Sequence, residues 1–217
     1  MIMSDRPNTD ALDTQRAWTV GGALVLLVVV LDAGAGGFLP DGGLVRALLL
    51  AAALVVFAVG VRGSGSVTAL RPTGTIALCA LAATLVVGWV VNATLVPMGG
   101  QLDAVVVVGQ VILVLQFALA LVAVERIGRL AVVPRPWNWA PAIAFGVIAL
   151  LYAATAIAAV LSRQVLEVFG YVAVAVNGIA SVAALVGLGV LAIVLGDRAG
   201  RSSSPDAPTP EVDVERD

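Results

Sequence analysis

The sequence contains no histidine and no lysine, so all twelve of its basic residues are arginine. Without histidine there can be neither a bis-histidine haem site nor a zinc site of the His–Glu type. Without lysine there can be no Schiff base and no Ser–Lys dyad. Cys79 is the single cysteine and can form no intrachain disulfide, and only three methionines are present. We therefore expect no cofactor, no metal site and no enzymatic activity.

Charge is also scarce, because only 12% of the residues are charged and 60% are hydrophobic. A soluble domain carries about 25% charged residues. The apolar segments are continuous runs of Ala, Val and Leu rather than alternating strands, and continuous runs predict helices that span a bilayer. The sequence therefore predicts an all-α integral membrane protein with the lipid bilayer as its main partner. A net charge of −2 and the lack of a basic cluster argue against nucleic-acid binding.

Six segments are long enough to cross roughly 30 Å of hydrocarbon, and short connections between them predict an antiparallel bundle. The expected spans are 17–39, 43–62, 73–96, 103–124, 138–161 and 168–195. They form a transmembrane domain over 17–196. Residues 1–16 are then a short cytoplasmic segment, and the Ser-, Pro- and acid-rich residues 197–217 are expected to be a disordered cytoplasmic tail.

Arginine predicts the orientation, because cytoplasmic loops of membrane proteins retain positive charge. Only Arg46 and Arg163 fall on one side of the six spans. The other ten arginines fall on the opposite side: Arg6, Arg16, Arg62, Arg71, Arg126, Arg129, Arg135, Arg198, Arg201 and Arg216. Both termini are therefore predicted to be cytoplasmic in a multi-pass plasma-membrane protein.

An alternative for the first span is a cleaved signal peptide, because Ala33-Gly34-Ala35 resembles a cleavage site after a short apolar stretch. Cleavage would leave five spans. The segment before that stretch carries Asp5, Asp10 and Asp13 beside its arginines, however, so it lacks the positive charge that a signal peptide shows. We expect the first span to be retained.

Asp32 interrupts the first apolar run, near its outer end. It follows Arg16 by sixteen positions, which is about 24 Å along a helix. The cost of a charge falls toward the interface, and Arg46 enters the next span from the same outer side. We expect Asp32 and Arg46 to form an ion pair that joins the first two helices. The alternative is an outward-facing site for a cation or proton at Asp32.

Small and polar residues recur within the later spans. Small residues let helices approach closely, and amides hydrogen-bond across the contact. The candidate packing residues are Ala80, Gly88, Gly146, Ala173 and Ser181. The candidate intramembrane polar residues are Thr84, Asn92, Gln110, Gln116 and Asn177. Helix packing is the preferred interpretation of both sets, and an amide-lined polar cavity is the alternative.

Two glycine-containing segments resemble known motifs without matching them. Residues 62–66, "RGSGS", lack the lysine and spacing of a phosphate-binding loop and predict a flexible cytoplasmic turn. Residues 41–46, "DGGLVR", resemble the start of the CDP-alcohol phosphotransferase signature, Asp-Gly-x-x-Ala-Arg. That resemblance implies a metal site completed by further aspartates, yet Val45 replaces the alanine and no acidic residue follows until Asp103. We set that function aside.

Two hypotheses remain. The first is a non-catalytic accessory, scaffold or interaction component of the membrane, acting as a homo-oligomer or with a membrane protein partner. The second is a permease for a small solute or ion that uses the amide-bearing helix faces and Asp32. An amide-lined face suits neutral or weakly polar solutes but supplies no acid–base pair for coupled transport.

Overall fold

The computed structural model describes residues 6–34, 42–61, 65–68, 70–95, 102–130, 137–161 and 163–201. Within these ranges the chain is helical and contains no β-sheet. The helices are α1 (Arg6–Gly34), α2 (Gly42–Val59), α3 (Pro72–Leu95), α4 (Leu102–Leu130), α5 (Ala140–Leu161) and α6 (Arg163–Arg201), with a short 3₁₀ helix, η1 (Trp137–Trp139), before α5. All six α-helices are long and apolar enough to cross a bilayer, which agrees with the six predicted spans.

Three helices extend beyond the predicted boundaries. α1 begins at Arg6, so most of the expected N-terminal segment 1–16 is helical rather than a separate element. α4 continues to Leu130, and α6 continues to Arg201, where Arg201 Nη2 lies 2.7 Å from Asp197 Oδ2 one turn earlier. An i,i+4 ion pair of this kind supports an exposed helix end by a few tenths of a kcal/mol, about 0.3–0.5. The predicted tail over 197–217 is therefore helical in its first five residues, and its remainder lies outside the described residues.

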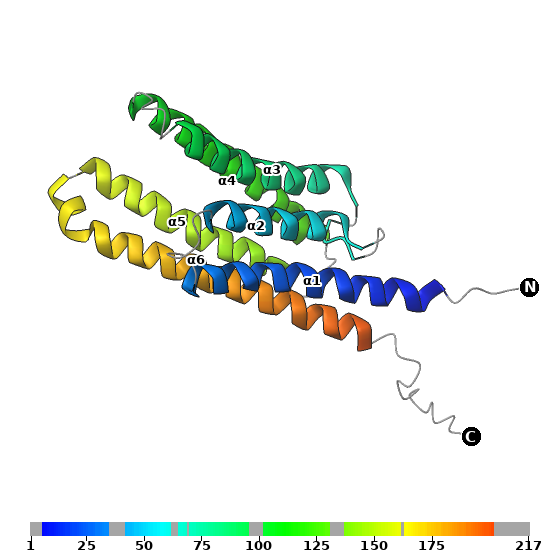
Figure 1. Cartoon of the computed structure of the whole chain (residues 1–217). Helices are drawn as coiled ribbons and strands as arrows, with labels where there is room; N and C mark the ends of the chain where they lie inside the picture. The colour runs from blue at the N-terminus through cyan, green and yellow to red at the C-terminus, as the bar shows by residue number, and fades with distance from the viewer. Residues whose placement is uncertain are drawn as a thin grey trace, which may run out of the picture.

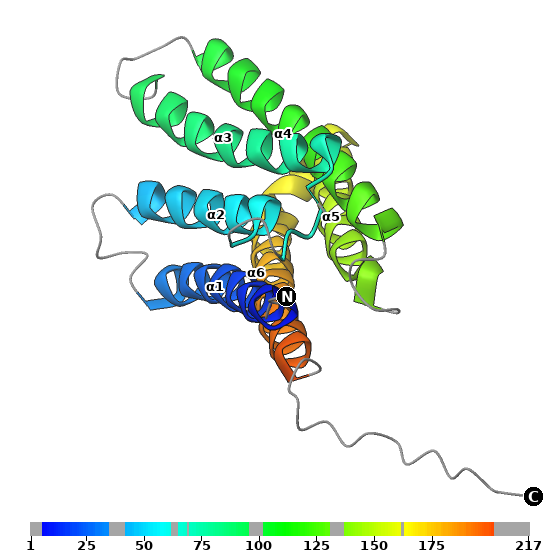
Figure 2. The same ribbon diagram turned by 90° about the vertical axis from the view of Figure 1, so that its right-hand side faces the viewer.

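The helices form a ring in which each packs against its neighbours in sequence, and α6 closes the ring against α1 (Figures 1 and 2). Within the described part of the chain, no two helices on opposite sides of the ring approach closely. The start of α1 and the end of α6 lie at the same end of the molecule (Figure 1). We call this the terminal end, and the other end the distal end.

The tightest contact joins α1 to α6 through glycine. A Cβ atom on Gly22 would lie 2.6 Å from the backbone oxygen of Gly189, and one on Gly189 would lie 2.9 Å from Leu26 Cγ. Two turns after Gly189 on α6, a Cβ on Gly196 would lie 3.1 Å from Trp18 Cβ. The two helices therefore run in opposite directions at a separation that only glycine allows.

Burial is concentrated toward the terminal end. One cluster of buried side chains there consists of Ala17, Trp18, Val67, Ile127 and Leu195. A second consists of Ala58, Ala77, Leu78 and Ala123, with Cys79 packed against it. Together these clusters hold α1, α2, α3, α4 and α6 around the segment that connects α2 to α3.

Candidate functional site

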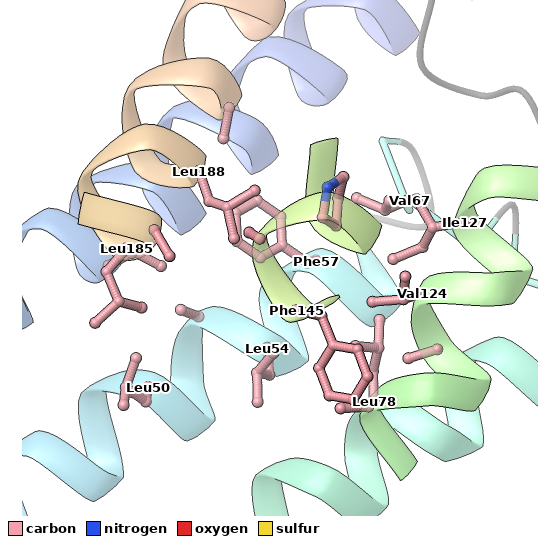
Figure 3. A pocket seen from close by; sticks show the side chains of 18 of the residues that line it. Leu50, Leu54, Phe57, Val67, Leu78, Val124, Ile127, Phe145, Leu185 and Leu188 are labelled. Carbon is pink, nitrogen blue, oxygen red and sulfur yellow. The ribbon is translucent and has the colours of Figure 1, made fainter. Parts of the chain in front are cut away.

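A cavity of about 440 Å³ lies at the centre of the ring (Figure 3). Every one of the six helices contributes to its lining, and so do η1 and the α2–α3 connection. Leu54 and Phe57 enter it from α2, Phe145 from α5, and Leu185 and Leu188 from α6. The ring arrangement creates the space, because helices that contact only their neighbours leave their inner faces without a partner across the centre.

The lining is almost entirely hydrocarbon. Its polar members are Arg46 and Ser181, together with the indole nitrogens of Trp18 and Trp137. The cavity follows α2 from Arg46 to Phe57, which is eleven residues and about 17 Å at the helical rise. Along α6 it runs from Ser181 to Leu195, about 21 Å. The space is thus long and narrow.

The cavity is only partly enclosed by the protein. Apolar cavities exclude water and accept apolar molecules instead. The chemistry of this lining therefore suits a hydrocarbon ligand.

The α2–α3 connection closes the cavity at the terminal end. Trp18 is 7% exposed, and its Nε1 donates a hydrogen bond to the Gly65 carbonyl over 2.8 Å. Val67 is buried, lines the cavity, and donates its N–H to the Phe57 carbonyl over 3.0 Å. Gly60 and Gly65 have φ angles of 73° and 77°, a left-handed conformation that lets the chain leave α2 and turn back into the bundle.

Buried hydroxyl groups hold this connection in place. Ser66 Oγ donates to the Ala58 carbonyl over 2.6 Å and accepts hydrogen bonds from the N–H groups of Thr68 and Leu70. Thr68 is fully buried, and its hydroxyl lies 2.8 Å from that of Thr75 on α3. Because the last carbonyls of a helix lack intrahelical donors, Ser66 satisfies the end of α2.

The expected flexible turn at 62–66 is therefore wrong for its last two residues. Gly65 and Ser66 belong to an ordered, hydrogen-bonded segment beneath Trp18, while 62–64 lie outside the described residues. The sequence was misleading because glycine and serine are typical of solvated turns. Here the glycines supply left-handed backbone and the serine supplies hydrogen bonds to buried backbone groups.

An ion pair lies at the distal end of the cavity. Arg46 Nε is 3.4 Å from Asp32 Oδ2, which joins the last turn of α1 to the first turn of α2 as the sequence predicts. The two side chains are 50% and 32% exposed, so the pair contributes at most about 1 kcal/mol. Arg46 lines the cavity and Asp32 does not.

The polar side chains of α3 do not line the cavity, and α3 meets α4 at the Thr84 carbonyl and at Gly88. Gln116 Nε2 on α4 donates to the Thr84 carbonyl over 3.2 Å, and a Cβ on Gly88 would lie 3.2 Å from Ile112. Asn92 Nδ2 donates to the Gly88 carbonyl of its own helix. Ala80, on the same face, is half-buried. Of the predicted stripe of small and polar residues, Thr84 and Gly88 therefore lie at the contact between α3 and α4.

The remaining predicted residues do not form one site. Gln110 is exposed on α4, Asn177 and Ala173 are half-buried on α6, and Ser181 lines the cavity. Gly146 is exposed on α5, and a Cβ built on it would meet no atom within 4 Å, so its role in helix packing stays a prediction. The central cavity is not the amide-lined cavity of the alternative prediction, because Thr84, Asn92, Gln110, Gln116 and Asn177 are all absent from its lining.

The small residues of α6 that form the tightest helix contact were not identified from the sequence. Gly189, Ala192 and Gly196 occur at intervals of three and four on α6, a small-residue pattern that could have been noticed, and they face α1.

Near the terminal end, Asn138 is 3% exposed and its Nδ2 donates to the Gly128 carbonyl over 3.2 Å. This bond anchors η1 to the end of α4, where the Trp139 ring covers Gly128.

The charged residues of the described ranges occur mostly in separate pairs. Asp13 lies near Arg16, Glu125 near Arg129 and Asp197 near Arg201. Across these ranges there is no group of three or more His, Cys, Asp or Glu side chains placed to hold a metal ion. Asp41, the first residue of the phosphotransferase-like segment, lies outside the described residues.

Comparison with known proteins gave no relative. No family model matches the chain. Searches of curated proteins and of solved structures found no significant match. The function must be inferred from the cavity and the helix surfaces alone.

Proposed function

We propose that the chain is a six-helix antiparallel bundle of the plasma membrane, with the terminal end in the cytoplasm. Three features support this orientation. The start of α1 and the end of α6 lie together, seven of the nine arginines in the described ranges belong to segments on that side, and Trp18, Trp137 and Trp139 lie near it. Arginine is retained in cytoplasmic loops, and tryptophan favours the membrane interface.

Labelling of engineered cysteines tests the orientation. In a Cys79→Ala background, Ser4→Cys and Ser203→Cys should both react with a membrane-impermeant maleimide only after the cell membrane is opened. Reaction of one of them in intact cells would contradict two cytoplasmic termini. Retention of residues 1–34 in the purified protein, read by intact mass, would at the same time exclude signal-peptide cleavage.

We further propose that the protein is a non-catalytic component that binds other constituents of the membrane, as an accessory or interaction subunit. One observation carries this proposal: the space that all six helices line is apolar, and the amide side chains lie outside it. A permease for a polar solute or ion needs polar groups along its path, because an unsatisfied polar group in an apolar medium costs several kcal/mol, about 2–7. Asp32 has Arg46 as its neighbour, with 3.4 Å between Oδ2 and Nε.

Co-purification in a mild detergent tests this proposal. We expect a stoichiometric membrane partner or a homo-oligomer, and the exposed glycine of α5 allows a specific probe. A Cβ at Gly146 would meet no atom within 4 Å, so we expect Gly146→Leu to leave the fold intact and to weaken association through α5. Gly109→Leu on α4 also enters open space and is the matched control.

The result that would overturn the proposal is equally concrete. A monomer that carries a small polar solute or an ion into proteoliposomes, with flux abolished by Asp32→Asn but normal expression, would identify a permease. Stable association of wild-type protein together with the absence of flux would support the interaction component.

A further inference from the structure

We propose that the central cavity binds one acyl chain of a phospholipid, with the lipid phosphate beside Arg46 and the chain end near Trp18. This inference deepens the proposed function and depends on the membrane location, but not on the identity of any protein partner. Three observations lead to it: the chemistry of the lining, the dimensions of the cavity and the different nature of its two ends.

The apolar side chains that line the cavity favour a hydrocarbon ligand. Leucine, alanine, valine, isoleucine and phenylalanine side chains from six helices surround the space, and Ser181 is the one hydroxyl among them. Such a surface offers no partners for the two to four hydrogen bonds that an ordered water needs. In a bilayer the most abundant hydrocarbon is the lipid chain, and the cavity is only partly enclosed by the protein. A chain can therefore enter from the surrounding membrane.

The dimensions suit a hydrocarbon chain. The cavity follows α2 for about 17 Å. Dividing 440 Å³ by that length gives a mean cross-section of about 26 Å², which is enough for one file of carbon atoms at van der Waals separations of about 3.5–4 Å. The cavity is therefore long enough and wide enough for an acyl chain.

The two ends of the cavity differ in polarity, and this difference predicts the orientation of the bound lipid. At the terminal end the space is closed by Trp18 and Val67, both buried and apolar toward the cavity. At the distal end Arg46 is half exposed, and its Nε faces Asp32. Arginine carries five N–H donors, so the other guanidinium nitrogens remain available to a phosphate in addition to Asp32. The headgroup is therefore expected at Arg46 and the chain end at the opposite limit.

Quenching of Trp18 fluorescence by lipids brominated near the chain end tests the proposal, because bromine quenches only at short range. The protein would carry Trp89→Phe, Trp137→Phe and Trp139→Phe and be reconstituted in phosphatidylcholine vesicles. Trp18 is only 7% exposed, so bulk lipid reaches it poorly. We expect strong quenching that is largely lost in Ala184→Phe, which fills the cavity, and kept in Ala183→Phe, whose side chain lies on the exposed face of α6.

A comparison of two brominated lipids tests the headgroup. At equal mole fraction, brominated phosphatidylglycerol should occupy the cavity, and so quench Trp18, about tenfold or more effectively than brominated diacylglycerol, since a hydrogen bond to a charged group is favourable by at least about that factor. Arg46→Gln should remove that preference, whereas Asp32→Asn should keep it. Equal quenching by the two lipids in the wild type would overturn the phospholipid assignment.

A second measurement needs no tryptophan replacement. Phosphorus analysis after exhaustive detergent washing should find about one phospholipid per wild-type chain and per Ala183→Phe chain, and markedly less per Ala184→Phe chain. The absence of Trp18 quenching, or equal quenching and equal retained phosphorus in the two phenylalanine variants, would overturn the proposal. Neither result depends on co-purification of a protein partner, so failure of this inference can be told apart from failure of the proposed function.

Discussion

A single methyl group between α1 and α6 should destabilise the fold measurably. Gly22→Ala places a Cβ 2.6 Å from the Gly189 carbonyl and 2.9 Å from Ile193, and a backbone atom cannot move aside as a flexible side chain can. Overpacking of this kind costs about 1–3 kcal/mol. Alanine also favours a helix over glycine by about 0.5–1 kcal/mol, so the gain in propensity partly masks the loss.

Gly187→Ala is the control that separates the gain in helix propensity from the overpacking cost. It lies two residues from Gly189 on the same helix, but its Cβ would meet no atom within 4 Å, so it gains propensity without a clash. The difference between the two variants is then the overpacking cost alone, about 1–3 kcal/mol, which corresponds to a melting temperature about 2–12 °C lower for Gly22→Ala. Cys79 is the only thiol and is half-buried, so a thiol-reactive dye follows unfolding in detergent without any added label. Equal melting temperatures for the two variants would refute the close approach of α1 and α6.

Three further perturbations test other contacts. Ser66→Ala should lower stability by about 1–3 kcal/mol in the same thiol assay, because it leaves the N–H groups of Thr68 and Leu70 without their partner and leaves the Ala58 carbonyl only the longer bond from Thr68 Oγ1; a change below the error of the assay would show that the α2–α3 connection is solvated. Gly88→Leu should destabilise the monomer by forcing α3 away from Ile112, and normal melting with loss only of an oligomer would place Gly88 on an outer surface instead. Asp32→Asn and Arg46→Gln should each cost at most about 1 kcal/mol, and a coupling energy well above that in a double-mutant cycle would show that the pair is more deeply buried than its exposure indicates.

The number of helices and their approximate limits could be predicted because lipid leaves so few alternatives. A continuous apolar run of about 20 residues has one stable backbone arrangement in hydrocarbon. The proximity of Asp32 and Arg46 followed from the same reasoning, since both lie near the outer ends of consecutive helices. The face shared by Thr84 and Gly88 followed from their spacing of four residues, although their partner on α4 did not.

The cavity could not be predicted because inner and outer faces of a membrane helix look alike. In water, polar residues mark the outside of a helix and the period of the pattern reveals the core. In lipid, Leu185 in the cavity and Val186 on the exposed surface are equally apolar. The pairing of α1 with α6 was hidden for a related reason, since it joins the first and last helices and no local pattern identifies a distant partner. The buried connection at 65–68 was hidden because its composition is that of a solvated turn.

Water access to the cavity is the most direct test of an apolar binding space as opposed to a polar path. In a Cys79→Ala background, Leu185→Cys places a thiol in the cavity, and Arg201→Cys places one at the exposed end of α6 as a positive control. A small charged methanethiosulfonate, applied to both faces of opened membranes, should modify the Arg201→Cys protein and leave the Leu185→Cys protein unreacted. Modification of both thiols at similar rates would reveal a water-filled path through the bundle and contradict the proposed function and the lipid site alike.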